Sequence, residues 1–343
     1  MLLPLTARAV VVHPGGEVQP PSELSSSIGR WGSNASLVAV APNYVITTRH
    51  QGGGVGTRVE LAGTEYRVSQ QWITGSADIR VAQIETLDYR PANLPTYVPT
   101  FSISDGLEPL RQQMLVGGWG DTRGQELIGH NTGEVYGYSW AATGNRSQTW
   151  GTNVIDRIED DPSVVRSWTS WLLQADYDGP DHSPTEGAAA DHDSGGGWFH
   201  QTAEGWRVIG LNAYVAKVGE SCFSSPRTGS DWPDSLSMIR VRSYSDWINS
   251  VADPFSVPPG DANWDGAVNE LDLEILNANW GLANMTWREG DFNGDSMVNL
   301  LDFSILSTRY QGGDPIAMQS DFVPEPTSLI ILAAGFFYIR RRK

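Results

Sequence analysis

The sequence predicts a mainly β fold followed by a small α-helical unit, and three observations support this. Between residues 10 and about 251, short apolar runs are separated by Gly, Pro, Asn and Asp, with few helical periods. Beyond residue 260, an acidic loop pattern occurs twice, and apolar residues at helical spacing follow each copy. Residues 323–343 contain an apolar run and a basic end.

The composition is that of a globular chain. Its 343 residues carry a formal net charge of −17, and 40% of them are hydrophobic, which is enough for one or two buried cores. The negative charge argues against nucleic acid as a partner and suits an exported or cation-binding protein. Cys222 is the single cysteine, so no disulfide can form within the chain.

Residues 1–9 are apolar and small, and they end in Ala7-Arg8-Ala9, a pattern typical of the end of a signal peptide. A basic leader and a full apolar run are missing. We therefore interpret residues 1–9 as a truncated signal peptide, with translation starting further upstream. A frayed terminus is the alternative.

The strand-like runs begin after this segment. The last part of the β region predicts a terminal helix, because Tyr244, Ile248 and Val251 share one helical face with Trp247. Five runs read as strands: residues 36–41, 44–47, 80–84, 114–116 and 206–211.

The string Asp193-Ser194-Gly195-Gly196 is a candidate nucleophile site. A serine hydroxyl reacts at neutral pH only when a base, an orienting group for that base and donors for the oxyanion are within reach. On its own the string equally suits a surface turn, so the prediction depends on partners elsewhere in the chain.

Five segments occur in one order along the chain: Ala41–His50, Asp78–Val81, Gly118–Thr122, Asp193–Gly196 and Ile239–Ile248. In this order they resemble the trypsin-like (chymotrypsin-fold) serine proteases. For residues 10–252, the resemblance implies two six-stranded antiparallel β-barrels with a C-terminal helix. It also implies a triad in which His50 is the general base, Asp78 orients it and Ser194 is the nucleophile. Without the resemblance, His50 reads as a solvated or core histidine and Asp78 as a strand-end cap.

The resemblance implies that the backbone N–H groups of His192 and Ser194 form the oxyanion hole. The family has glycine at the position of His192, and a non-glycine residue at positive φ costs about 1 kcal/mol. A peptide flip there would turn the donor away. In zymogen-type members Asp193 pairs with a new N-terminal ammonium, and a chain beginning near Val10 is the candidate here.

The family's primary specificity pocket maps onto residues without an acidic group at the base, so a preference for Arg or Lys is not supported. Val215 replaces a glycine and narrows the pocket, which favours small apolar substrate side chains. The mapped residues are Ala188, Ala189, Ala213, Tyr214 and Val215.

Residues 253–259 are rich in proline and read as an interdomain linker. In the repeat that follows, residues 260–313, Gly260–Asp272 is matched by Gly290–Asp302. Each copy has oxygen-bearing side chains at loop positions 1, 3, 5, 9 and 12 and a main-chain carbonyl at position 7, a spacing that wraps one loop around one Ca²⁺. An acidic turn is the alternative, and it explains two copies poorly. The predicted ligands of the two calcium ions are Asp261, Asn263, Asp265, Ala267, Asn269, Asp272, Asp291, Asn293, Asp295, Met297, Asn299 and Asp302.

These loops resemble type I dockerin repeats, which have Asp at position 12 and no helix before the loop. Ser296 replaces the usual glycine at position 6 of the second copy, which predicts weaker binding there. A unit of this size rarely folds on its core alone, so we expect structural calcium. Dockerins bind cohesins, which implies a cohesin-like partner. The residues that select it would be Glu270-Leu271 and Leu300-Leu301.

After a second linker, residues 314–322, the chain ends in residues 323–343, which resemble a PEP-CTERM sorting signal recognised by an exosortase. Val323-Pro324-Glu325-Pro326 is followed by an apolar run over 329–339, expected to be a hydrophobic helix, and by a basic end. The run spans roughly 17 Å against a hydrocarbon core of about 30 Å, so a transient stop is favoured over a permanent anchor. A buried terminal helix is the alternative, and it does not explain the basic end.

Together these patterns predict an exported serine endopeptidase that acts on protein or peptide substrates. They place it at the cell surface or outer envelope of a Gram-negative-type bacterium, or released from it. The alternative is a weak or inactive pseudoprotease that serves as a surface binding or adhesion module. In a third interpretation the dockerin-like pair has the main function, as an assembly part.

Overall fold

The computed structural model describes residues 10–128, 133, 135–141, 146–177, 183–216, 235–252, 258–263 and 265–311. The chain divides into two compact units, Met1–Leu87 with Pro91–Ser256, and Val257–Lys343 with Asp88–Arg90. The main boundary falls between Ser256 and Val257, inside the segment predicted as a linker.

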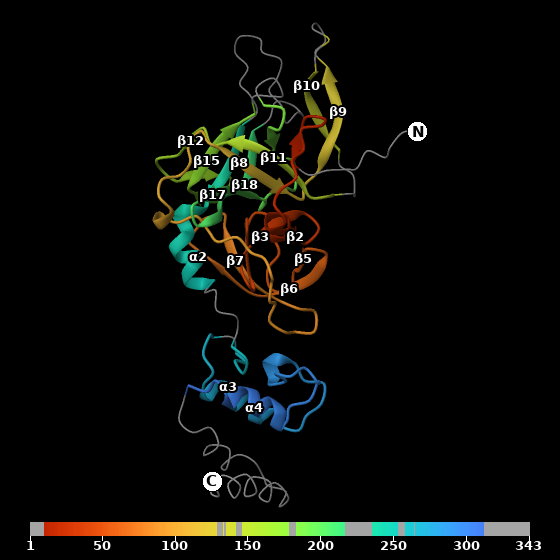
Figure 1. The fold of residues 1–343 in the computed structure, drawn as a ribbon, viewed down its shortest axis with the longest axis vertical. Coiled ribbons are helices and arrows are strands. Elements are labelled where there is room, and N and C mark those ends of the chain that lie inside the picture. The colour runs from red at the N-terminus through yellow and green to blue at the C-terminus, as the bar shows by residue number, and fades with distance from the viewer. Residues whose placement is uncertain are drawn as a thin grey trace, which may run out of the picture. The chain divides into compact units, whose positions relative to one another are not determined.

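Six strands of the first unit close into an antiparallel barrel, drawn in orange and red in Figure 1. The expected first barrel is therefore confirmed. One strand, β3, is buried along its whole length: Leu37 and Ala39 fill the barrel, and Val38 and Val40 pack on the other side against the second sheet. In barrel order the strands are β2 (Ile28–Trp31), β3 (Ala35–Ala41), β4 (Tyr44–Thr47), β7 (Arg80–Glu85), β6 (Thr64–Ile73) and β5 (Arg58–Leu61).

The second half of this unit is a seven-stranded antiparallel sheet, where the sequence predicted a closed six-stranded barrel. Its two edge strands are neighbours in the chain, separated only by Ile155 and Asp156. What would be one strand is thus broken into two pieces that pair at opposite edges of the sheet. In sheet order the strands are β11 (Thr149–Val154), β8 (Gln113–Gly118), β17 (Gly197–Thr202), β18 (Gly205–Ala216), β19 (Ser235–Arg240), β15 (Leu172–Asp176) and β12 (Arg157–Ile158).

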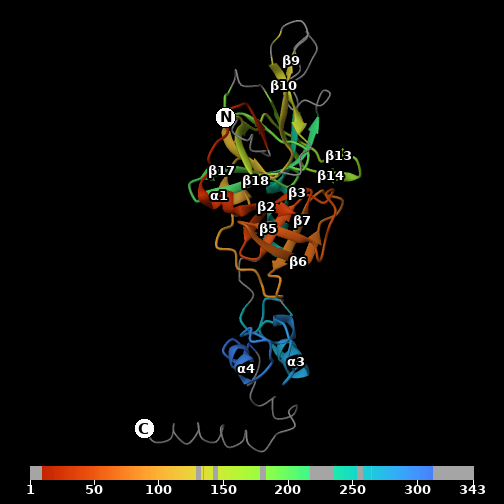
Figure 2. The ribbon, with the colours of Figure 1, turned by 90° about the vertical axis from the view of Figure 1, so that its right-hand side faces the viewer.

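Three short strand pairs and several helices complete the first unit. The hairpin of β9 (Thr122–Ile128) and β10 (Val135–Ala141) extends from the seven-stranded sheet in both views (Figures 1 and 2). The other pairs are β1 (Val11–Val12) with β16 (Gly187–Ala188), and β13 (Ser163–Val165) with β14 (Trp168–Ser170). The helices are α1 (Ser22–Ser27), the 3₁₀ turns η1 (Ile103–Asp105) and η2 (Val241–Tyr244), and α2 (Ser245–Val251).

A shared apolar core joins the barrel to the seven-stranded sheet. Ile46 and Val81 of the barrel belong to the same buried cluster as Phe199 and Leu211 of the sheet, each with no exposed surface. The predicted helix is confirmed as α2, and its Ile248 is buried in this cluster. Burial of this kind contributes about 25 cal/mol for each Å² of apolar surface, so the two β bodies hold each other in place.

The second unit is built from two calcium-loop repeats and their helices, α3 (Glu270–Ala278) and α4 (Leu300–Ser307), with η3 (Trp287–Glu289) between them. Figure 2 shows α3 and α4 side by side. Leu273 and Leu276 of α3 pack with Phe303 and Leu306 of α4 in one small core. Such a core is too small to stabilise a domain of this size by itself.

Candidate functional site

The three predicted triad residues come from loops at the ends of strands in both β bodies. His50 follows β4, and Asp78 precedes β7, so the barrel supplies both. Ser194 lies in the loop that leads into β17 of the seven-stranded sheet. The site therefore forms only where the two bodies meet.

The structure brings these side chains into one hydrogen-bonded row. His50 Nδ1 lies 2.5 Å from Asp78 Oδ2, and His50 Nε2 lies 2.9 Å from Ser194 Oγ. When His50 Nδ1–H donates to the Asp78 carboxylate, the Nε2 lone pair faces the serine hydroxyl. This arrangement can pass the serine proton to the imidazole, which is what a serine nucleophile requires.

Asp78 is fully buried, and four groups donate hydrogen bonds to its carboxylate. Oδ1 accepts the backbone N–H groups of Arg49 and His50, each at 2.8 Å. Oδ2 accepts from His50 Nδ1 at 2.5 Å and from the Tyr214 hydroxyl at 2.6 Å. The carboxylate orientation is fixed, so Asp78 orients the His50 ring and is not a simple strand-end cap.

Tyr214 was predicted to line the specificity pocket, and the structure places its hydroxyl on Asp78 instead. Its ring also stacks on His50, with 5.5 Å between the ring centroids. The pairing of β18 with β19 shifts between Asn212 and Tyr214, and such a bulge re-aims a side chain. Burial and the bond to Asp78 raise the pKa of Tyr214, so it remains a neutral donor.

The other predicted pocket residues lie around this strand and β16. Ala188 and Ala189 are buried in the apolar cluster of the seven-stranded sheet, and Val215 packs against the same cluster. Ala213 packs instead against the cluster shared with the barrel. Residues 217–234, which follow on from β18, lie outside the described residues.

The predicted oxyanion donors depend on the backbone at His192. This residue has φ of 73°, in the left-handed region. A positive φ was expected here, because the family that the first unit resembles has glycine at this position. Its side-chain Nδ1 lies 3.1 Å from the carbonyl oxygen of Asn34. Neither the N–H of His192 nor that of Ser194 has an acceptor among the described residues, so both are available to a ligand oxygen.

Asp193 connects this loop to the start of the described chain. Its carboxyl is completely buried and accepts the backbone N–H groups of Gly120, Ala190 and Val10. Burial is the main influence and raises the pKa of Asp193 to about 7, from an ordinary value of 3.8. The segment beginning at Val10 thus meets the residue with which a new N-terminus was expected to pair.

Gln51 is a second partner for His50 that the sequence pattern does not indicate. The side-chain nitrogen of Gln51 lies 2.7 Å from His50 Nε2, the same atom that faces Ser194 Oγ. Two donors therefore compete for one imidazole lone pair. A glutamine directly after the histidine is the only signal that could have indicated this.

Both predicted calcium loops curl around their first and last aspartates. Asp261 accepts the N–H groups of Asp265 at 3.2 Å and Gly266 at 2.8 Å. Asp272 accepts N–H groups from the start of the loop through Oδ1, and from Asn269 through Oδ2 at 2.9 Å. The second loop repeats this pattern with Asp291, Asn299 and Asp302.

The donor set of these loops fits Ca²⁺. Asp261, Asp272 and Asp302 have no exposed surface, and burial raises the pKa of Asp272. Buried carboxylates of this kind are stabilised by a hard cation. Among the described residues, no group of three or more His, Cys, Asp or Glu is already gathered as a metal site. The other half of the predicted ligands are of different types: the asparagines at positions 3 and 9 and the carbonyl at position 7.

The residues predicted to select a partner lie on the surface of the second unit. Leu271, Leu300 and Leu301 are exposed by 54%, 54% and 60%. They stand in the first turns of α3 and α4, and the core uses later residues of each helix instead. The helix starts therefore present apolar side chains to solvent.

Comparison with known proteins identifies a family for part of the second unit and none for the first. Residues 259–311 match the dockerin type I domain family. Dockerin domains of this type bind calcium and mediate assembly between proteins. No curated protein matches the chain.

Several predicted segments lie outside the described residues. These are residues 1–9, most of the linker 253–259, the linker 314–322 and the sorting signal 323–343. No helix in the described part of the chain is long and apolar enough to cross a membrane.

Proposed function

We propose that the first unit is a serine endopeptidase that hydrolyses peptide bonds through an acyl-enzyme at Ser194. The observation on which this rests is the continuous row from Asp78 through His50 to Ser194 Oγ, with contacts of 2.5 and 2.9 Å. Three residues from two β bodies meet with the contacts that this chemistry needs, and an ordinary surface turn has no reason to produce them.

In this reaction His50 Nε2 takes the proton of Ser194 as the hydroxyl attacks the substrate carbonyl. Asp78 stabilises the imidazolium, and the N–H groups of His192 and Ser194 bind the carbonyl oxygen as it becomes negative. His50 then returns the proton to the departing amine. Water, activated by the same imidazole, hydrolyses the acyl-enzyme and regenerates Ser194.

A fluorophosphonate probe tests this proposal directly, because it labels only a serine that has been activated. We expect labelling of the full chain and none of Ser194→Ala, with His50→Ala also unlabelled. Ser36→Ala is a poor control because Ser36 Oγ accepts the backbone N–H of Trp119. Ser183→Ala serves instead, because the Ser183 hydroxyl contacts the hydroxyl of Thr185 and no triad residue. Absence of labelling in folded protein would refute the peptidase.

A pseudoprotease is the second candidate, and one contact favours it. The Gln51 side-chain nitrogen, 2.7 Å from His50 Nε2, holds the lone pair that Ser194 needs. If Gln51 only slows an active peptidase, Gln51→Ala frees the imidazole and raises probe labelling. If the protein is a pseudoprotease, labelling stays absent in both forms while the site still binds peptides.

For the second unit we infer a calcium-loaded module that docks a cohesin-like protein. Two ions, one in each loop, would be held by the predicted carboxylate, amide and carbonyl oxygens. The exposed Leu271, Leu300 and Leu301 provide apolar contact area for a partner. Circular dichroism of the chain with and without a calcium chelator tests the first part: an unchanged spectrum refutes structural calcium.

We also propose that the chain is exported and sorted to the cell surface. Proteins with dockerin domains are typically extracellular or attached to the cell surface, which agrees with the leader-like residues 1–9 and the sorting-signal-like residues 323–343. The proposed envelope is of the Gram-negative type, and an exosortase would process the tail. Fractionation of cells expressing the chain with and without residues 323–343 tests this, because retention in the cytoplasm of both forms refutes it.

A further inference from the structure

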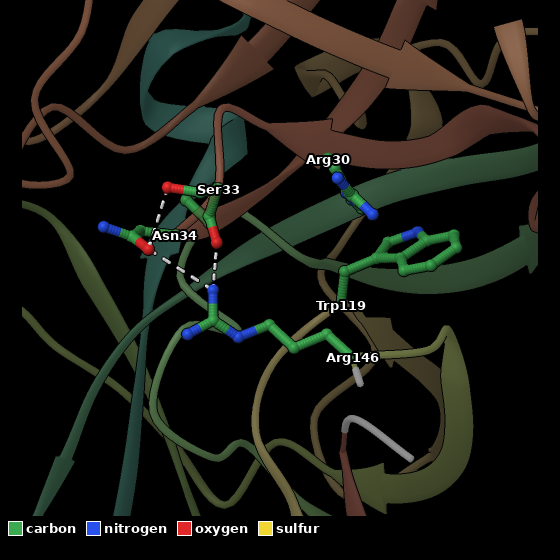
Figure 3. Close-up of a pocket in the computed structure, with 6 residues that line it drawn as sticks. Arg30, Ser33, Asn34, Trp119 and Arg146 are labelled. Carbon is green, nitrogen blue, oxygen red and sulfur yellow. Dashed lines mark hydrogen bonds between the residues drawn. The ribbon is translucent and has the colours of Figure 1, made fainter. Parts of the chain in front are cut away.

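A cavity of about 330 Å³ lies beside the Ser194 loop, separate from the predicted specificity pocket. Figure 3 shows Arg146 reaching to Ser33 and Asn34 at one side of it, with Arg30 above the Trp119 ring at the other. The cavity is lined by Arg30, Ser33, Asn34, Ala35, Trp119 and Arg146.

Backbone hydrogen bonds fix which side of the nucleophile this cavity occupies. The carbonyl of Ser194 accepts the N–H of Ser36 at 2.9 Å, so the start of β3 runs along one side of the loop. On the other side, Gly195 donates to the carbonyl of Asn212 in β18 at 2.8 Å. The predicted specificity pocket belongs to the β18 side. A peptide that enters there and crosses Ser194 leaves along β3, toward the cavity.

The distance along that path is short. Asn34, which lines the cavity, precedes Ser36 by two residues, or roughly 7 Å of extended chain. His192, one of the two oxyanion donors, also touches Asn34 through Nδ1 at 3.1 Å. The cavity is therefore within reach of the first or second substrate residue after the cleaved bond.

The polar groups directed at this cavity are mainly donors. The Arg30 guanidinium lies 5.9 Å from the centroid of the Trp119 ring. The acceptors at the opposite wall are already in use, since Arg146 Nη1 donates to the Ser33 carbonyl and to Asn34 Oδ1.

Each arginine has one acidic neighbour, which contacts only one of its guanidinium nitrogens. Arg146 contacts Asp121 through Nε at 3.2 Å, and Arg30 approaches Glu60 through Nη1 at 3.7 Å. Nη2 of each guanidinium has no acceptor in the described part of the chain. Two guanidinium groups thus line one cavity, in a chain whose formal net charge is −17.

We propose that this cavity binds the side-chain carboxylate of an Asp or Glu located one or two residues after the cleaved bond. The inference rests on the proposed peptidase function, because only that function gives the substrate a direction across Ser194. A carboxylate can accept from both guanidinium groups, and such charge-assisted bonds are about twice as strong as neutral ones. The amide of Gln or Asn has the same shape without the charge.

Internally quenched peptides test the proposal. Each has Ala before the cleaved bond and Glu or Gln at one of the two following positions, with an amidated C-terminus. We expect kcat/KM for the Glu peptide to exceed that for the Gln peptide by about tenfold. Arg30→Gln and Arg146→Gln should each remove most of this preference while sparing the Gln peptide. Equal rates on the two peptides would overturn the proposal.

Arg58→Gln is the matched control, since this arginine lies on β5 of the same barrel with a side chain that is 60% exposed. It should keep the full preference. If Arg146→Gln fails to fold, Arg30→Gln decides alone, because its side chain is 42% exposed and has fewer contacts. A preference found only in peptides with a free C-terminal acid would assign the cavity to the chain terminus and overturn the side-chain proposal.

Binding to Ser194→Ala separates this proposal from the peptidase itself. With this variant, fluorescence anisotropy reports the affinity for the Glu and Gln peptides without any chemistry. If no peptide is cleaved, yet the Glu peptide binds about tenfold more tightly and Arg30→Gln removes the difference, the cavity assignment stands and only the peptidase is refuted. Equal binding of both peptides refutes the cavity assignment.

Discussion

Asp193→Asn, compared in two forms of the chain, tests how the N-terminal segment is coupled to the Ser194 loop. In the chain beginning at Met1, Val10 offers only a peptide N–H to the buried Asp193 carboxyl. Burial raises the pKa of this carboxyl to about 7, from an ordinary value of 3.8. The neutral acid is therefore the form that the folded protein favours.

The sign and size of the effect follow from that shift. Because the folded-state pKa lies above the unfolded one, the stabilisation is complete below about pH 4 and is lost as the pH rises through 7. A difference of 7 − 3.8, or about 3 pKa units, corresponds to roughly 4 kcal/mol at most. Asparagine has nearly the same shape and cannot ionise, so Asp193→Asn should remove this slope.

The slope should change sign when the chain begins at Val10. Its α-ammonium then replaces the peptide N–H, and an adjacent positive charge lowers the pKa of Asp193. A lowered folded-state pKa gives stability that is present above the ordinary value and lost as the pH falls. Above about pH 8 the amine loses its proton, and the pairing weakens again.

Urea unfolding followed by tryptophan fluorescence, with saturating Ca²⁺, measures these slopes between pH 4.5 and 8. The difference between each form and its own Asp193→Asn variant cancels the titration of the other carboxylates. A stability difference that falls with pH across this range in the longer form and stays flat in the shorter form, whose own loss comes only below about pH 4, supports the coupling. Identical slopes for all four proteins would show that Asp193 is not buried as described.

Three further changes test other parts of the molecule. Tyr214→Phe removes one hydrogen-bond donor from Asp78, so the carboxylate should attract the protonated His50 ring more strongly. The acid limb of the pH profile of probe labelling should therefore move up by as much as about one pH unit. An unmoved limb would contradict this role of Tyr214. Chelation of calcium should unfold residues 260–311 as seen by circular dichroism and leave the labelling of Ser194 unchanged, whereas a parallel loss of both would show that the units depend on each other. Ser296→Gly should tighten calcium binding by the second loop about fivefold, measured by calorimetry, because glycine adopts the required φ without strain.

The sequence was sufficient where the pattern is local. Strand-like alternation located β3, β4, β7, β8 and β18, and the helical face of residues 244–251 located α2. His50, Asp78 and Ser194 were predicted to lie together because the family resemblance links motifs that lie far apart in the chain. Propensity alone could not do this, since His50 and Ser194 lie 144 positions apart in the sequence and no local pattern connects them.

The sequence failed where one residue changes the register. The break at Ile155 and Asp156 separates β11 from β12, which pair at opposite edges, so the second body is a seven-stranded sheet where a six-stranded barrel was predicted. The bulge before Tyr214 turns a predicted pocket residue toward Asp78. Both changes depend on how the neighbouring strand fits, which is a tertiary effect that single-residue preferences do not contain.

His192 and Ser296 present the same problem in two different loops. Both stand where the families that the two units resemble have glycine, and both adopt positive φ, 73° and 67°. The loops impose this angle. Asp193 is held by backbone donors next to His192, and the N–H of Ser296 donates to Asp291 at 3.0 Å.

The cost at His192 is therefore strain of about 1 kcal/mol, and within the described part of the chain its N–H, like that of Ser194, has no acceptor. A glycine would relieve this strain, but it would also lose the contact from His192 Nδ1 to the Asn34 carbonyl. That contact joins the loop of His192 and Ser194 to the turn of Ser33 and Asn34, which lines the cavity beside Arg30 and Arg146. It follows that His192 couples the position of the two backbone N–H groups, its own and that of Ser194, to the shape of the cavity, a link that glycine could not provide.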